Sequence, residues 1–104
     1  MAYTPKEIDR LLVFSAAELA RKRRARGLPL NHPEALALLT DEVFEEARAG
    51  RAWTDVVAHA RGVLRRSEVL PGVPELLRVI QVDAMFPDGT RLVTVHEPIA
   101  EDMP

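Results

Sequence analysis

The sequence predicts an α+β fold in which three main helices come first and a single C-terminal β-hairpin comes last. Cap signals at Thr4 and Asn31 each precede a stretch whose apolar residues are spaced three and four apart, which is typical of a helix. From Ile80 onward the spacing changes to two, which is typical of a strand. Helices followed by strands, rather than alternating with them, indicate the α+β class. We expect residues 1–104 to form one domain, because a chain of this length suffices for one core and not for two.

The first helix is predicted to begin at Pro5 and to run to about Arg26. Thr4 can cap the free amide groups, and Glu7 can reach back to it as in a capping box. Gly27 then supplies a left-handed stop. We expect one face of this helix to be buried, formed by Ile8, Leu11, Leu12, Ser15, Ala16 and Leu19.

The second helix is predicted to follow the Asn31 cap, with Glu34 completing a second capping box and Gly50 ending the helix. Its expected buried stripe consists of Leu36, Leu39, Val43 and Ala47, widened by Ala35 and Phe44. A short third helix carries Trp53, Val56, Val57 and Ala60. A single tryptophan at a helix start is more often a core residue than an exposed one, so we expect Trp53 to be buried.

The segment between the third helix and the hairpin is mixed. Residues 65–68 can form one turn of helix, and the run Pro71-Gly72-Val73-Pro74 interrupts it. Another helical turn can begin at Pro74 before the first strand.

The hairpin is the clearest local signal in the chain. Ile80, Val82, Ala84 and Phe86 share one face by the period of two. The run Phe86-Pro87-Asp88-Gly89 fits a type I turn, and a second strand is expected over 91–96, before Pro98. Because two strands are not stable alone, this ribbon must lie on a helix or on a partner.

The composition excludes several classes of protein. A formal net charge of −2 argues against a general nucleic-acid or membrane-surface binder, and the lack of cysteine excludes disulfides and thiolate chemistry. No apolar run approaches the roughly 20 residues that span a bilayer. The first residues also lack the charged-then-apolar pattern of a signal peptide. We therefore expect a soluble cytoplasmic protein with neither a nucleic acid nor a membrane as its partner.

No catalytic or metal-binding constellation is evident. His32, His59 and His96 are far apart and form none of the usual metal-ligand spacings, so we expect structural or surface roles for them. The acidic pairs 41–42 and 45–46 cannot converge on one site, because neighbouring helical residues point about 100° apart. We expect these acidic pairs to be solvated. The sequence also has no nucleophile elbow and no glycine-rich phosphate loop.

The basic run from Arg21 to Arg26 is the strongest charge feature and has two interpretations. It could contact nucleic-acid phosphates. It could instead be a solvated or subunit-facing helix end, where cations complement the helix dipole. The balanced net charge and the absence of a DNA-binding motif favour the second interpretation.

Three stretches of the sequence carry a family resemblance. At the start, Tyr3-Thr4-Pro5-Lys6-Glu7 corresponds to a family pattern Leu-Thr-Pro-Arg-Glu. The middle agrees at 26–27, 30–35, 38, 40–41 and 46–51, and the run 86–99, Phe-Pro-Asp-Gly-Thr-Arg-Leu-Val-Thr-Val-His-Glu-Pro-Ile, is the most specific match. Over roughly residues 2–99 the sequence resembles the gamma subunit of bacterial urease. It departs from the family at His32, where Tyr is usual, and at Ala52, where Ser or Thr usually caps the third helix; the lost cap costs about 1 kcal/mol.

The resemblance implies a small non-catalytic, structural subunit of urease, which hydrolyses urea to ammonia and carbon dioxide by way of carbamate. In that family the nickel centre belongs to the alpha subunit, where histidines, a carbamylated lysine and an aspartate hold it. None of those ligands maps onto this chain, so we expect no catalytic, metal or cofactor site here. The implied partners are the alpha and beta subunits, in a trimer of heterotrimers. The candidate interface residues are Arg21, Arg23, Arg24, Phe86, Pro87, Asp88, Arg91, His96, Pro98 and Ile99.

Two alternatives from other classes stay open at this point. One is a free-standing helical binding module that uses the basic stretch Arg21–Arg26 for nucleic acid or protein. The other is a small hydrolase of its own, which would need a pocket with converging histidines and carboxylates. Salt-sensitive DNA binding would support the first, and turnover of urea by the isolated chain would support the second.

Overall fold

The computed structural model describes residues 2–102 and confirms the α+β class. Within these residues the elements are α1 (Pro5–Ala25), α2 (His32–Arg48), α3 (Trp53–Ala60), β1 (Leu64–Arg65), the 3-10 turn η1 (Arg66–Glu68), α4 (Val73–Leu76), β2 (Val79–Phe86), β3 (Gly89–His96) and β4 (Ile99–Ala100). The three main helices and the C-terminal hairpin are thus as predicted, and both short helical turns before the hairpin are present.

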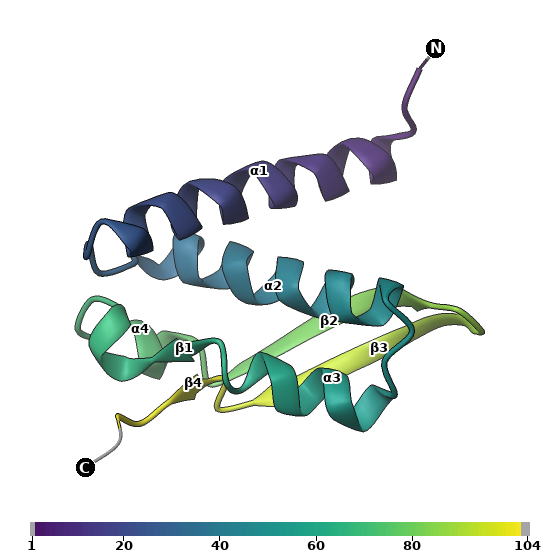
Figure 1. The fold of residues 1–104 in the computed structure, drawn as a ribbon. Helices are drawn as coiled ribbons and strands as arrows, with labels where there is room; N and C mark the ends of the chain where they lie inside the picture. Colours follow the sequence, from purple (N-terminus) through teal and green to yellow (C-terminus); the bar gives the residue numbers. More distant parts are fainter. Residues whose placement is uncertain (1, 103–104) are drawn as a thin grey trace.

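The elements form layers, with α2 in the middle (Figure 1). One side of α2 packs against α1, and the other side packs against β2 and α3. The helix α1 is therefore an outer layer whose far side has no neighbouring element in this view (Figure 1). None of the described helices has the length and apolar character needed to cross a bilayer.

Both predicted capping boxes are present. The Glu7 amide donates to the Thr4 hydroxyl at 3.1 Å, and the Thr4 amide donates to the Glu7 carboxylate at 2.8 Å. Asn31 and Glu34 repeat this exchange at 3.0 and 2.9 Å. The hydrogen bond from the Asn31 backbone, together with one from Arg23, lowers the pKa of Glu34. The short helix α3 begins at Trp53 without a side-chain cap, as expected from Ala52.

The core lies between α2, α3 and one face of the hairpin. Burial along β2 alternates strictly, and the predicted face of Ile80, Val82, Ala84 and Phe86 is the buried one. The strands pair in antiparallel register from Val79–His96 to Phe86–Gly89, so β3 starts two residues earlier than predicted. Gly89 has a φ of +132°, a value that L residues rarely adopt. The hairpin is thus covered within the chain by α2 and α3.

One pair of strands was not predicted. β1 and β4 pair in parallel through Leu64–Ile99 and Arg65–Ala100, which ties the C-terminal segment to the connection after α3. Strands of two residues are too short to show a periodic pattern, so their pairing could not be predicted from the sequence. Their pairing buries Ile99 and the preceding Pro98.

The predicted buried face of α1 is wrong. Ile8, Leu11, Leu12 and Leu19 are 44–63% exposed, and Ser15 and Ala16 are also exposed. The face that packs on α2 instead buries Ala17 and Ala20. Alanine lets the two backbones approach closely, and flanking arginines bond to α2, so the smaller and more polar face is the inner one.

Three other expectations about burial are also wrong. Trp53 is 45% exposed, because the uncapped start of α3 lies at the surface. On α2, Leu36 is 36% exposed while Leu38, which the predicted stripe omitted, is 1% exposed. Asp41, expected to be solvated, is 1% exposed because α1 covers it.

Candidate subunit interface

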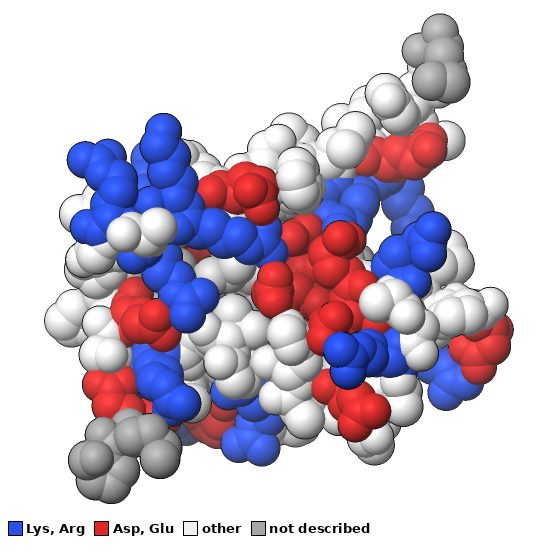
Figure 2. Space-filling model, viewed as in Figure 1, with Lys and Arg blue, Asp and Glu red and all other residues white. Residues whose placement is uncertain are grey.

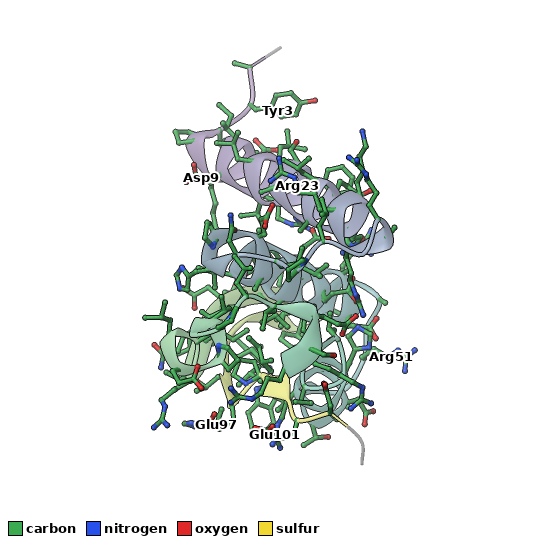
Figure 3. The ribbon with its side chains drawn as sticks, turned by 90° about the vertical axis from the view of Figure 1, so that its left-hand side faces the viewer. Tyr3, Asp9, Arg23, Arg51, Glu97 and Glu101 are labelled. Carbon is green, nitrogen blue, oxygen red and sulfur yellow. The ribbon has the colours of Figure 1, made fainter. Side chains whose placement is uncertain are left out.

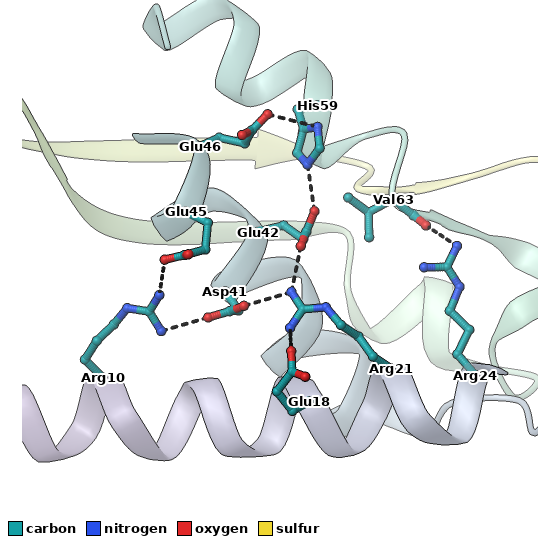
Figure 4. Close-up of polar contacts among 10 residues, drawn as sticks. All are labelled: Arg10, Glu18, Arg21, Arg24, Asp41, Glu42, Glu45, Glu46, His59 and Val63. Carbon is teal, nitrogen blue, oxygen red and sulfur yellow. Dashed lines mark hydrogen bonds and ion pairs between the residues drawn. The ribbon is translucent and has the colours of Figure 1, made fainter. Parts of the chain in front are cut away.

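A network of charged side chains joins α1 to α2 (Figure 4). The buried carboxylate of Asp41 accepts a hydrogen bond from Arg10 at 2.8 Å through one oxygen and from Arg21 at 2.8 Å through the other. Arg10 also bonds Glu45 at 2.9 Å, and its guanidinium lies 4.5 Å from the centre of the Phe44 ring. A buried charge is tolerated only with such partners, so Asp41 fixes where α1 sits on α2.

The same network reaches α3 (Figure 4). Arg21 donates to Glu42 at 2.6 Å, and Glu42 lies 2.7 Å from His59, which is also 3.2 Å from Glu46. Burial opposes the charge on Glu42, but the hydrogen bonds from His59 and Arg21 outweigh it and lower the pKa of this carboxyl. Burial likewise opposes the charge on Arg21. The hydrogen bonds that it donates to Asp41, Glu42 and Glu18 outweigh this effect and raise the pKa of the guanidinium. These charged groups are therefore paired with one another within the chain.

The basic run divides into inward and outward residues. Arg21 belongs to the network, Arg23 bonds Glu34, and Arg24 bonds Glu68 at 2.8 Å and the Val63 carbonyl at 2.9 Å. These three candidate interface residues therefore hold α1 to other parts of its own chain. Lys22 and Arg26 are exposed and have no ion pair within residues 2–102. Figure 2 shows basic side chains gathered at the end of α1 and acidic ones over the middle of the same face.

The tip of the hairpin brings together four of the candidate residues. A hollow of about 300 Å³ is lined by Phe86, Pro87, Asp88 and Arg91 together with Arg51 and the exposed Trp53. The hydrogen bond from Arg91 to Asp88, at 2.6 Å, lowers the pKa of that carboxyl. Phe86 contributes mainly to the core, since it is only 5% exposed.

The three candidate interface residues near the C-terminus differ in their exposure. His96 is exposed at the end of β3, whereas Pro98 and Ile99, the latter within β4, are buried. In this chain Pro98 and Ile99 offer little surface to a partner. Figure 3 places Glu97 and Glu101 at the side of the molecule opposite Tyr3, with α1 as the outermost layer on the Tyr3 side.

An exposed apolar surface was not predicted from the sequence. It consists of the outer face of α1 and a neighbouring hollow of about 650 Å³ between the start of α1, the end of α2 and the hairpin. The hollow is lined among others by Tyr3, Leu11, Phe44 and Met85. The sequence did contain an indication of this surface. Ala17 and Ala20 form a second face of α1, opposite the apolar stripe, and that face could equally have been buried.

The described residues do not suit a nickel centre. Within 2–102 no three His, Asp or Glu side chains come together in a way that could hold a metal ion. His59 is bonded to two glutamates, and no buried side-chain nitrogen or oxygen in this part of the chain lacks a hydrogen-bond partner.

The comparison with known proteins agrees with the stretches that suggested a family. The family model described as "Urease, gamma subunit" matches residues 1–99. The chain belongs to the urease gamma-subunit family. It is 60% identical over 100 residues to "Urease subunit gamma" of Frankia alni, a match that covers 96% of this chain and 100% of that relative.

Proposed function

We propose that the chain is a non-catalytic, structural subunit of a cytoplasmic urease complex. In this proposal it assembles with alpha and beta subunits into a trimer of heterotrimers, and the complex hydrolyses urea to ammonia and carbon dioxide by way of carbamate. Nickel and the reacting groups belong to the alpha subunit. The family membership supports the partners, and the missing metal-ligand cluster within the described residues supports the division of roles.

The observation that carries this proposal is the amount of large apolar side chain left in water. Leu12 is 63% exposed and Met85 62%, and Leu11, Phe14 and Leu19 of α1 accompany Leu12. Meanwhile most charged groups of the basic run are bonded within the fold. A surface of this composition is suited to burial against other subunits rather than to binding a small polar substrate.

The alternative of a nucleic-acid module is weakened by the same contacts. Arg21, Arg23 and Arg24 neutralise carboxylates of their own chain, so the cations free to meet phosphates are fewer than the sequence suggested. Binding of phosphates needs unpaired Lys and Arg.

Co-purification tests the proposed function. The tagged chain is expressed in its native host and eluted at physiological salt, and its partners are identified by mass and by nickel-dependent urea hydrolysis. We expect two larger chains and activity to elute with it. Elution of the chain alone would contradict the proposal, as would a complex of alpha and beta subunits with undiminished activity and oligomeric state when this chain is deleted.

A further inference from the structure

We infer that the outer face of α1 is a docking strip for a different chain, whose matching surface is an apolar groove with carboxylates at one end. The strip is defined here by Ile8, Leu11, Leu12, Ser15, Ala16, Leu19, Lys22 and Arg26. This inference rests on the proposed function, because it specifies a surface through which the subunit would join its complex.

The strip is continuous along the helix. Its apolar members recur at spacings of three and four, so they share one face over about three turns. The four large ones are 44–63% exposed, although this face is more apolar than the face that packs on α2. An amphipathic helix normally buries its more apolar face. In α1 the less apolar face is buried against α2, and the more apolar face is left exposed, as expected of a helix that a further layer of protein would cover.

The charged end of the strip indicates the chemistry of the partner. Lys22 and Arg26 continue the same face, three and seven residues beyond Leu19. Neither has an ion pair among the described residues, whereas Arg21, Arg23 and Arg24 beside them are all paired. Charged groups at the rim of an interface select partners of opposite charge, so the groove is expected to end in Asp or Glu side chains.

A second copy of this chain would not place carboxylates opposite the cations of the strip. An antiparallel pair centred on Ser15 would place Leu11 opposite Leu19, but it would also place Lys22 opposite Ile8 and Arg26 opposite Thr4. The two carboxylates that flank Ile8 in the sequence, Glu7 and Asp9, point about 100° away from it around the helix, so neither is directly opposite Lys22 in such a pair. A parallel pair would place like charges together, which disfavours association. The charges therefore favour a different chain.

The inner face of α1 is held firmly enough to present the strip. The two arginine bonds to Asp41 and the capping box at Thr4 fix both the position and the start of the helix. The strip is therefore preformed, and docking does not require α1 to fold or to move.

The test compares Leu12→Asp with a matched control, Leu76→Asp, in the complex recovered from the native host. Leu76 is 69% exposed but lies on α4, outside the strip. We expect Leu12→Asp to reduce recovery of the partner chains at least about tenfold, since a buried leucine is exchanged for a charge, and Leu76→Asp to leave it unchanged. Circular dichroism of both variants is expected to match the unsubstituted chain, because neither side chain is in the core.

A second pair of variants tests the charged end. We expect Lys22→Glu to weaken recovery, more strongly at low salt than at high salt, and Arg61→Glu to have no effect. Arg61 is exposed, follows α3 and has no ion pair within residues 2–102.

The outcomes separate the two proposals. If the unsubstituted chain recovers no partners, the proposed function fails. If it recovers them and Leu12→Asp does so equally well, the strip is wrong and the proposed function stands. The isolated chain could instead sediment as a dimer that the Leu12→Asp substitution dissociates, and this result would overturn the inference in favour of a second copy. Binding of the chain to anionic phosphatidylserine vesicles would overturn it in favour of a membrane.

Discussion

Replacing Asp41 with asparagine is expected to loosen α1 from α2. The carboxylate is 1% exposed and receives bonds from Arg10 and Arg21, both at 2.8 Å. Asparagine keeps the shape and one acceptor oxygen, but its amide group cannot accept a hydrogen bond from the second arginine. The substitution also removes the negative charge that offsets two guanidinium groups.

The magnitude follows from the exposure of the partners. A hydrogen bond to a charged group contributes about 1.5–3 kcal/mol, and breaking a buried ion pair costs about 3–5 kcal/mol. Both arginines are 30% exposed and can be solvated again, so the lower part of this range applies. We expect Asp41→Asn to lower the free energy of unfolding by about 2–3 kcal/mol.

Urea denaturation of the full chain, followed by circular dichroism, measures this change. With a slope of about 1–3 kcal/mol per M, a loss of about 2–3 kcal/mol lowers the midpoint by roughly 0.7–3 M. The matched control is Glu45→Gln, which removes a charge that also pairs with Arg10 but is 61% exposed, and its expected effect is below about 0.5 kcal/mol.

Loss of the Asp41 ion pairs is also expected to make local opening of α1 more frequent. Because α1 packs mainly on α2, amide hydrogens of Pro5–Ala25 are expected to exchange faster in Asp41→Asn while those of β2 change less. If the midpoint moved no further than in the Glu45 control, the ion pairs would contribute nothing, and the alanine contacts alone would hold α1.

Three further predictions concern stability. Ala52→Ser supplies the missing cap of α3 and is expected to raise the free energy of unfolding by about 1 kcal/mol in urea denaturation, whereas an unchanged midpoint would contradict the role assigned to the cap. Leu39→Ala removes a fully buried side chain of α2 and is expected to cost about 2–5 kcal/mol; a loss below 1 kcal/mol in the same assay would show that the site collapses to fill the cavity. The lowered pKa values of Glu34 and Glu42 mean that the unfolded chain binds protons first on acidification, so their stabilisation is complete above about pH 4.5 and is lost as the pH falls through their folded-state pKa values. Thermal melts from pH 7 to pH 3 check this, with Glu42→Gln expected to flatten the profile and an unaltered profile counting against the assignment.

Local features of the fold could be predicted because neighbouring residues determine them. The capping boxes at Thr4 and Asn31 involve side chains only three residues apart, and the alternation along β2 is visible in any window of a few residues. The same holds for the uncapped start of α3 at Ala52. The family resemblance likewise depends on short runs of sequence and was confirmed over residues 1–99.

The candidate interface was less predictable. The basic run was recognised as one feature, but its members point in different directions, and Arg24 bonds residues that are 39 and 44 positions away. Nothing near Arg24 in the sequence indicates these partners. The hairpin tip was placed correctly as a turn, yet its Phe86 belongs largely to the core.

The order of the elements, the starts of the first two helices, the buried face of the hairpin and the family could all be predicted from short stretches of sequence. The tertiary structure alone decided which face of α1 is inside, because both faces of that helix have helical periodicity and only the fit to α2 chooses between them. Alanines that allow close approach and a buried Asp41 that needs two arginines make the smaller face the inner one. The larger apolar side chains are consequently left outside, where they form the surface proposed to meet another subunit.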